Sequence, residues 1–221
     1  MRAYRTESTV AGVLFITATV STMASQIVIA PMLGAPDVAG HVAGHRAAFV
    51  SGVILELVNA LASAGIAIAL FPIIWRCVRS VAVAYLGLRI IEASLGAFAA
   101  GALLILLSFS DPAIAIALHE WGFLLVLIVF SVGTLILYPL LFSYRLVPPV
   151  LSLWGLIGGV MLLVSCLLIL FGRIETGSRA DLVLSLPIWI NEMALALWLI
   201  LRGVDPRHAP STAISKVSPA R

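Results

Sequence analysis

Charged residues are scarce in this 221-residue chain. Only 10% of its residues are Asp, Glu, Lys or Arg, and Lys216 is its single lysine. Soluble domains carry about 25% charged residues, so this composition excludes an ordinary soluble domain. The net charge of +3 is too small and too dispersed to indicate a nucleic-acid partner, and none is expected. The two cysteines, Cys77 and Cys166, are too few for a disulfide framework.

Sequence motifs of catalysis and cofactor binding are also lacking. The chain has no phosphate-binding glycine loop, nucleophile elbow or dinucleotide fingerprint, so we expect no cofactor and assign no catalytic residue. His41 and His45 have a spacing that can bind zinc on a helix. Gly40 and Gly44 beside them argue against a firm helix, and no metal site is expected. Whether the chain is an enzyme stays open, with a non-enzymatic role favoured.

Long apolar runs are what the chain does have, and 62% of its residues are hydrophobic. A bilayer core is about 30 Å thick and needs roughly 20 apolar residues per helix, which each run supplies. Only helices and closed barrels satisfy their backbone in lipid, and these runs exceed barrel strands in length. The sequence therefore predicts an all-α, polytopic integral membrane protein, a six-transmembrane helical bundle. The expected spans are residues 10–30, 49–75, 81–107, 120–142, 150–171 and 182–201.

These spans form one predicted transmembrane domain, residues 1–204. Residues 205–221 are rich in Pro and Ser, lack periodicity, and are expected to be a flexible cytoplasmic tail. Pro31 is expected to end the first span. That span loosely resembles a signal peptide, but its length favours a retained helix.

The distribution of basic residues predicts the orientation of the bundle. Nine Arg and Lys residues fall on the side that holds both termini and the second and fourth loops, against three on the other side. The positive-inside rule then places both termini in the cytoplasm.

Two charged residues stand in the middle of the third span. Arg89 and Glu92 are three positions apart, so on a helix they share a face with Tyr85 and Gly96. An ion at the bilayer centre costs roughly 3 kcal/mol on insertion scales. A helix that keeps two such ions near the bilayer centre needs polar or charged groups on facing helices to pair with them.

Further polar residues lie at depths that suggest a shared well. Two are in the outer half of the second span, two open the fourth span at the outer surface, and two fall near the middle of the sixth. No comparable set lies in the inner third, so we predict a polar well that opens outward. The candidate ligand-binding or proton-handling residues are Glu56, Asn59, Arg89, Glu92, His119, Glu120, Asn191 and Glu192.

Acids outnumber bases within the spans. Glu56, Glu92 and Glu192 face the single guanidinium of Arg89. One pair can neutralise, but the other two carboxylates must bind protons, face water or meet a cationic ligand. The alternative is a purely structural role, in which Arg89 ties Glu92 and Glu192 together and joins the third helix to the sixth.

A resemblance to a known family rests on five segments: AGVLFIT at 11–17, LRIIEA at 88–93, LHEWGF at 118–123, LFSYRLVP at 141–148 and NEMALALWLILRG at 191–203. In their order and spacing they resemble the bacterial membrane-protein family called domain of unknown function 4386, over roughly residues 8–204. Pro149 departs from the pattern, where a basic residue is expected. The resemblance implies a multi-pass protein of the bacterial inner (plasma) membrane and no established activity.

Three functions are consistent with these features. The first is a sensor or accessory module that binds a small amphiphilic or cationic ligand in the outward-facing well. The second is a proton-coupled secondary transporter, which with only six helices would act as a homo-oligomer. The third is an intramembrane lipid-modifying enzyme, with Glu92 or Glu192 as general base and His119 at the mouth. Membrane lipids are expected partners in each case.

Overall fold

The computed structural model describes residues 4–108 and 112–204, and within them all regular secondary structure is helical. Six of the described helices are long and apolar enough to cross a membrane, which confirms the predicted six-helix bundle and makes the chain a multi-pass membrane protein. The predicted tail, residues 205–221, lies outside the described residues. The long helices are α1 (Arg5–Leu33), α3 (Arg46–Cys77), α4 (Arg79–Leu103) with the 3-10 turn η1 (Leu104–Leu107), α5 (Ala113–Ser143), α6 (Pro149–Leu170) and α7 (Arg179–Leu201).

Two of the differences from the predicted helix boundaries lie next to prolines. Pro31 lies inside α1 and does not end it, because a proline in the last turns removes only one backbone hydrogen bond. α5 begins at Ala113, seven residues before the expected start at Glu120, since the apolar residues after Pro112 continue the helix.

A short helix, α2 (Val38–Gly44), links α1 to α3, where a glycine-weakened loop was expected. The Asp37 side chain accepts a hydrogen bond from the backbone N–H of Gly40 at 2.9 Å, which caps α2 and offsets the cost of its glycines. His41 and His45 are exposed, and their rings stack with centroids 5.1 Å apart.

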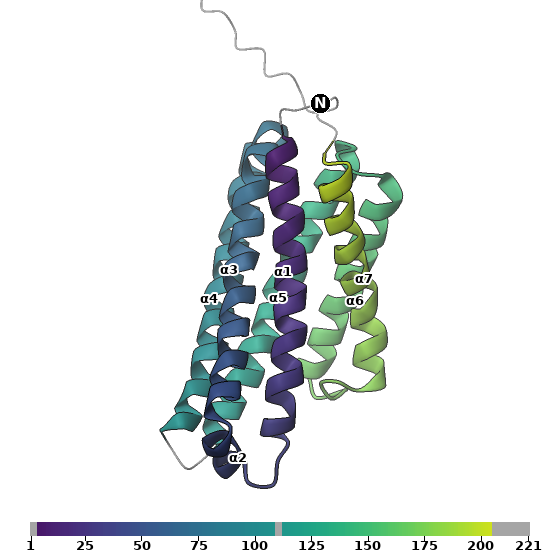
Figure 1. Cartoon of the computed structure of the whole chain (residues 1–221). Helices are drawn as coiled ribbons and strands as arrows, with labels where there is room; N and C mark the ends of the chain where they lie inside the picture. The colour runs from purple at the N-terminus through teal and green to yellow at the C-terminus, as the bar shows by residue number, and fades with distance from the viewer. Residues whose placement is uncertain (1–3, 109–111, 205–221) are drawn as a thin grey trace, which may run out of the picture.

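The six long helices form a closed ring in chain order. Each packs against the next, α1 on α3, α3 on α4, α4 on α5, α5 on α6 and α6 on α7, and α7 closes the ring on α1 (Figure 1). Both ends of the described chain lie at one end of the bundle, which we call the terminal end; the opposite end is the α2 end. This order places α4 opposite α7 across the interior.

Small residues allow the close contacts of α6 with its neighbours. A Cβ at Gly158 would lie 2.9 Å from Cα of Ile188 in α7. A Cβ at Gly155 or Gly159 would overlap the side chains of Tyr138 and Thr134 in α5. These glycines let the α6 backbone approach both helices, which is how dispersion stabilises helix pairs in lipid.

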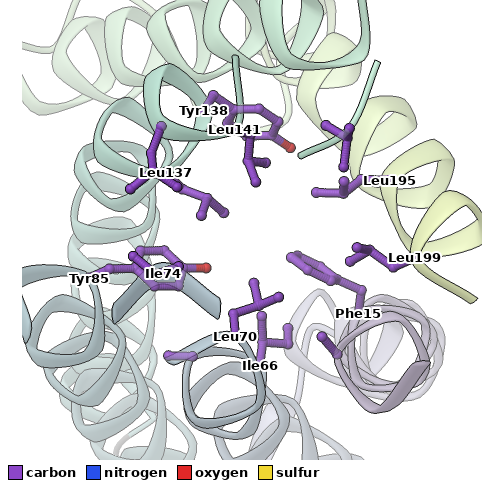
Figure 2. Packing of buried hydrophobic residues seen from close by; sticks show 14 of the residues in the cluster. Phe15, Ile66, Leu70, Ile74, Tyr85, Leu137, Tyr138, Leu141, Leu195 and Leu199 are labelled. Atoms are coloured by element: carbon purple, nitrogen blue, oxygen red, sulfur yellow. The ribbon is translucent and has the colours of Figure 1, made fainter. Parts of the chain in front are cut away.

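Apolar side chains fill the ring in two clusters. The larger cluster lies toward the terminal end, where Figure 2 shows Phe15, Leu70, Tyr85, Leu137 and Leu195 pointing inward from five helices. The smaller cluster, at the α2 end, takes its buried described members from α1, α2, α3, α4, η1 and α5. Buried polar side chains lie between the two clusters.

Candidate functional site

Arg89 is held in the interior of the ring by α3 and α4. Its Nη1 donates hydrogen bonds to Glu92 Oε1 at 2.8 Å and to Ser63 Oγ at 3.3 Å, and its Nε donates to Tyr85 Oη at 3.0 Å. The rings of Phe130 and Tyr85 lie with their centroids 5.0 and 5.5 Å from its Cζ. Carboxylate, hydroxyls and aromatic rings together replace the hydration that a buried guanidinium loses.

Glu92 belongs to the same network. Ser63 Oγ donates to Glu92 Oε1 at 2.7 Å, so the serine connects α3 to the Arg89–Glu92 ion pair of α4. The sequence suggested a structural alternative in which Arg89 ties Glu92 and Glu192 together and joins the third helix to the sixth. That alternative is wrong, because Arg89 pairs with Glu92 and the network joins α4 to α3. The reason is the ring order, which sets α7 across the interior from α4.

A cavity of about 80 Å³ lies beside this network, close to the midpoint of five helices. A water molecule takes up roughly 30 Å³ in the liquid, so the cavity can hold at least two waters or a small polar head group. Its apolar wall includes Phe15, Phe123, Phe130 and Trp189. Its polar lining consists of Thr19, Thr22, Asn59, Ser63, Arg89, Glu92 and Glu192.

Glu192 reaches the cavity from α7 and is only partly buried. The ion pairs of the described residues are Arg89–Glu92 and His119–Glu56, and Glu192 takes part in neither. No described residue donates a hydrogen bond to its carboxylate. Arg89 attracts it across the cavity without forming an ion pair. The Asn59 amide also lines the cavity.

Glu56 and His119 form a second buried pair, nearer the α2 end. His119 Nε2 lies 3.1 Å from both carboxylate oxygens of Glu56, and Ser25 Oγ donates to Glu56 Oε1 at 3.3 Å. The three side chains come from α5, α3 and α1. The expectation that His119 lies at the outer surface is wrong, because α5 starts at Ala113 and His119 is about 9 Å along the helix.

Asn191 and Glu120 do not line the cavity. Asn191 is fully buried between helices, where Tyr138 Oη donates to its Oδ1 at 2.6 Å and its Nδ2 donates to the carbonyl of Leu151 at 2.9 Å. It therefore joins α5, α6 and α7. Glu120 is exposed on the outside of the bundle, because one residue along α5 turns it about 100° away from His119.

The site contains residues that the sequence analysis does not assign. Ser63 lies seven positions after Glu56 and Tyr85 four before Arg89, so helical spacing could have identified both. Trp189 lies three positions before Glu192, so the same spacing could have identified it as well. Phe130 has no such relation to the residues assigned from the sequence, and its place at the cavity follows from the ring of helices.

A ring of six membrane-spanning helices around a polar cavity defines a polytopic membrane protein with an interior site. The family model described as Domain of unknown function (DUF4386) matches residues 10–203, and the chain belongs to this family, as the resemblance indicated. Comparison with curated proteins and with solved structures gives no significant match.

Proposed function

We propose that the protein is a membrane-embedded binding protein, a sensor or accessory subunit, for a small amphiphilic ligand that carries an amine. The observation that carries this proposal is Glu192, a carboxylate at the cavity with no hydrogen-bond donor and no ion-pair partner among the described residues. An unpaired carboxylate away from bulk water is costly. An ammonium group in the cavity supplies the missing positive charge.

Arg89 does not oppose such a ligand. Its charge is already balanced by Glu92 at 2.8 Å, and the hydroxyls of Ser63 and Tyr85 accept two of its other hydrogen bonds. The cavity therefore contains one positive group and two carboxylates, and one of these, Glu192, has no hydrogen bond or ion pair among the described residues. Its net character favours a cation over an anion.

The other walls of the cavity suit an amine on a hydrocarbon chain. The carbonyl oxygen of Asn59 and the hydroxyl of Thr22 can accept hydrogen bonds from an ammonium group. The aromatic side chains of Phe123 and Trp189 offer surfaces that attract cations and cover methylene groups. These features support an amphiphilic amine over a fully hydrated metal ion.

For the location, we propose the bacterial inner membrane, with the terminal end in the cytoplasm and the α2 end toward the periplasm. The excess of Arg and Lys on the terminal side supports this orientation. The cavity would then lie near the bilayer centre.

Titration of the purified protein in nanodiscs with dodecylamine tests the proposal. We expect Glu192→Gln, which keeps the side-chain shape, to weaken binding about tenfold to a hundredfold, since a charge-assisted hydrogen bond is lost. Glu120→Gln is the matched control, because Glu120 is exposed outside the cavity. Equal affinity in Glu192→Gln, or equal binding of uncharged dodecanol, would contradict the proposal.

A second candidate, proton-coupled transport, is favoured by one observation. The Glu56–His119 pair lies between the cavity and the α2 end, and both side chains can exchange protons. In proteoliposomes this candidate predicts amine movement driven by a pH gradient and lost in His119→Gln. The exposed His45, changed to Gln, is the control. Amine movement that does not depend on the pH gradient would contradict proton-coupled transport.

A further inference from the structure

We infer that the ligand enters the cavity sideways from the lipid, through the seam between α1 and α7 in their half nearer the α2 end, and that its hydrocarbon chain stays in this seam. The inference rests on the proposed function and specifies its ligand: a single-chain alkyl amine drawn from the membrane. The amine is at Glu192 and the chain points outward between the two helices.

The seam is closed in the half nearer the terminal end. A Cβ at Gly12 of α1 would lie 2.7 Å from the carbonyl oxygen of Ala196 in α7, so the two backbones are in close contact. Arg5 Nη2 donates to the carbonyl of Ile200 at 2.8 Å, and the backbone N–H of Val204 donates to Ser8 Oγ at 3.3 Å. No ligand of this kind can pass there.

The same faces of the two helices separate toward the α2 end. Met23 lies eleven residues after Gly12, on nearly the same stripe of α1, yet this residue is 55% exposed. On α7, Ala196 is fully buried, whereas Leu182, on nearly the same stripe, is 59% exposed. Figure 1 shows α7 leaning away from α1 in this direction. The contact surface is thus lost on both helices over the same half of the bundle.

The cavity is lined at this seam by both helices. Thr19 and Thr22 of α1 and Trp189 and Glu192 of α7 line it, and all four are only partly buried. A carboxylate at the inner end and apolar residues such as Met23 at the outer end match the two parts of an amphiphilic amine.

The described residues at the two ends of the bundle leave no comparable route. Toward the α2 end, the buried Glu56–His119 pair and an apolar cluster drawn from α1 to α5 lie between the cavity and that end of the bundle. Toward the terminal end lies the larger apolar cluster, to which Phe15 and Leu195 belong. The lateral seam is therefore the opening that suits a ligand already dissolved in the membrane.

Lipid access to Trp189 tests the route. A variant that keeps Trp189 and has Phe at the other four tryptophans is placed in nanodiscs whose acyl chains carry bromine, which quenches tryptophan. We expect loss of Trp189 emission, no quenching by aqueous iodide, and recovery when dodecylamine fills the seam. Adding Glu192→Gln should abolish the recovery and leave the lipid quenching. A variant keeping only the exposed Trp121 should be quenched with no recovery.

The outcomes separate the route from the site. If dodecylamine binding depends on Glu192 but Trp189 is quenched by iodide and not by brominated lipid, the lateral route is wrong and the proposed function stands. If no amine binds, both are wrong.

A variant that blocks the seam gives a second test. Met23→Trp should weaken dodecylamine binding, whereas Val20→Trp, on the outward face with 56% exposure, should not. Equal binding in both would also overturn the route.

Discussion

Glu92 and Glu192 face one cavity from opposite helices, and their surroundings differ. Glu92 is 4% exposed and accepts hydrogen bonds from Arg89 and Ser63. Glu192 is more exposed and has no hydrogen-bond partner among the described residues. The ring of helices explains the difference. α3 and α4 are neighbours, so their donors both reach Glu92, whereas Glu192 on α7 faces these donors across the cavity. The same side chain can therefore stabilise a bundle at one position and be free for a ligand at another.

The largest effect is expected from removing Arg89, the guanidinium that forms the ion pair with Glu92. Arg89→Met leaves a buried carboxylate without its cation, and we expect a loss of about 3–5 kcal/mol in the free energy of unfolding. Denaturation in mixed micelles measures it. The double variant Arg89→Met with Glu92→Leu should recover most of the loss. A double variant as unstable as the single one would show that Arg89 acts by packing alone.

A smaller loss in the free energy of unfolding is expected where the backbones of α6 and α7 are in close contact. Gly158→Ala places a methyl group against the α7 backbone at Ile188, and we expect a cost of about 1–3 kcal/mol from overpacking. Gly101→Ala is the control, because nothing lies within 4 Å of its added Cβ. Similar melting temperatures for the two variants would contradict the packing of α6 on α7.

Removing one hydrogen bond from the polar contact that joins α5 to α7 should cost less again. Tyr138→Phe deletes the 2.6 Å hydrogen bond to Asn191, and we expect a loss of about 1 kcal/mol. In a double-mutant cycle with Asn191→Leu the two effects should not add. Additive losses would mean that the two side chains act independently. Cavity binding of the amine should be unchanged, since Asn191 does not line the cavity.

No loss of stability is expected at Glu192 itself. Glu192→Gln breaks no hydrogen bond or ion pair among the described residues and removes an unpaired carboxylate, so we expect the free energy of unfolding to stay the same or to rise by up to about 1 kcal/mol. Glu92→Gln weakens a buried ion pair and should cost clearly more in the same assay. A reversed order of the two variants would invalidate the distinction between the carboxylates.

The fold could be predicted from the sequence because bilayer thickness fixes the length of an apolar helix. The depth of each residue could also be predicted from its position along its span, and Arg89, Glu92 and Glu192 do lie near mid-helix at a common cavity. The order of helices around the ring is not encoded in hydropathy, so the missing contact between Arg89 and Glu192 could not be foreseen. Glu120 was grouped with His119 by depth alone, although helical phase separates them.

The most direct test of the account is an infrared difference spectrum of the protein with and without dodecylamine. A carboxyl band that changes on binding should appear in the wild-type protein and in Glu92→Gln, and should be missing in Glu192→Gln. If the band persists in Glu192→Gln and vanishes in Glu92→Gln, the ligand is at the Arg89 side of the cavity, and the assignment of the two acids is contradicted.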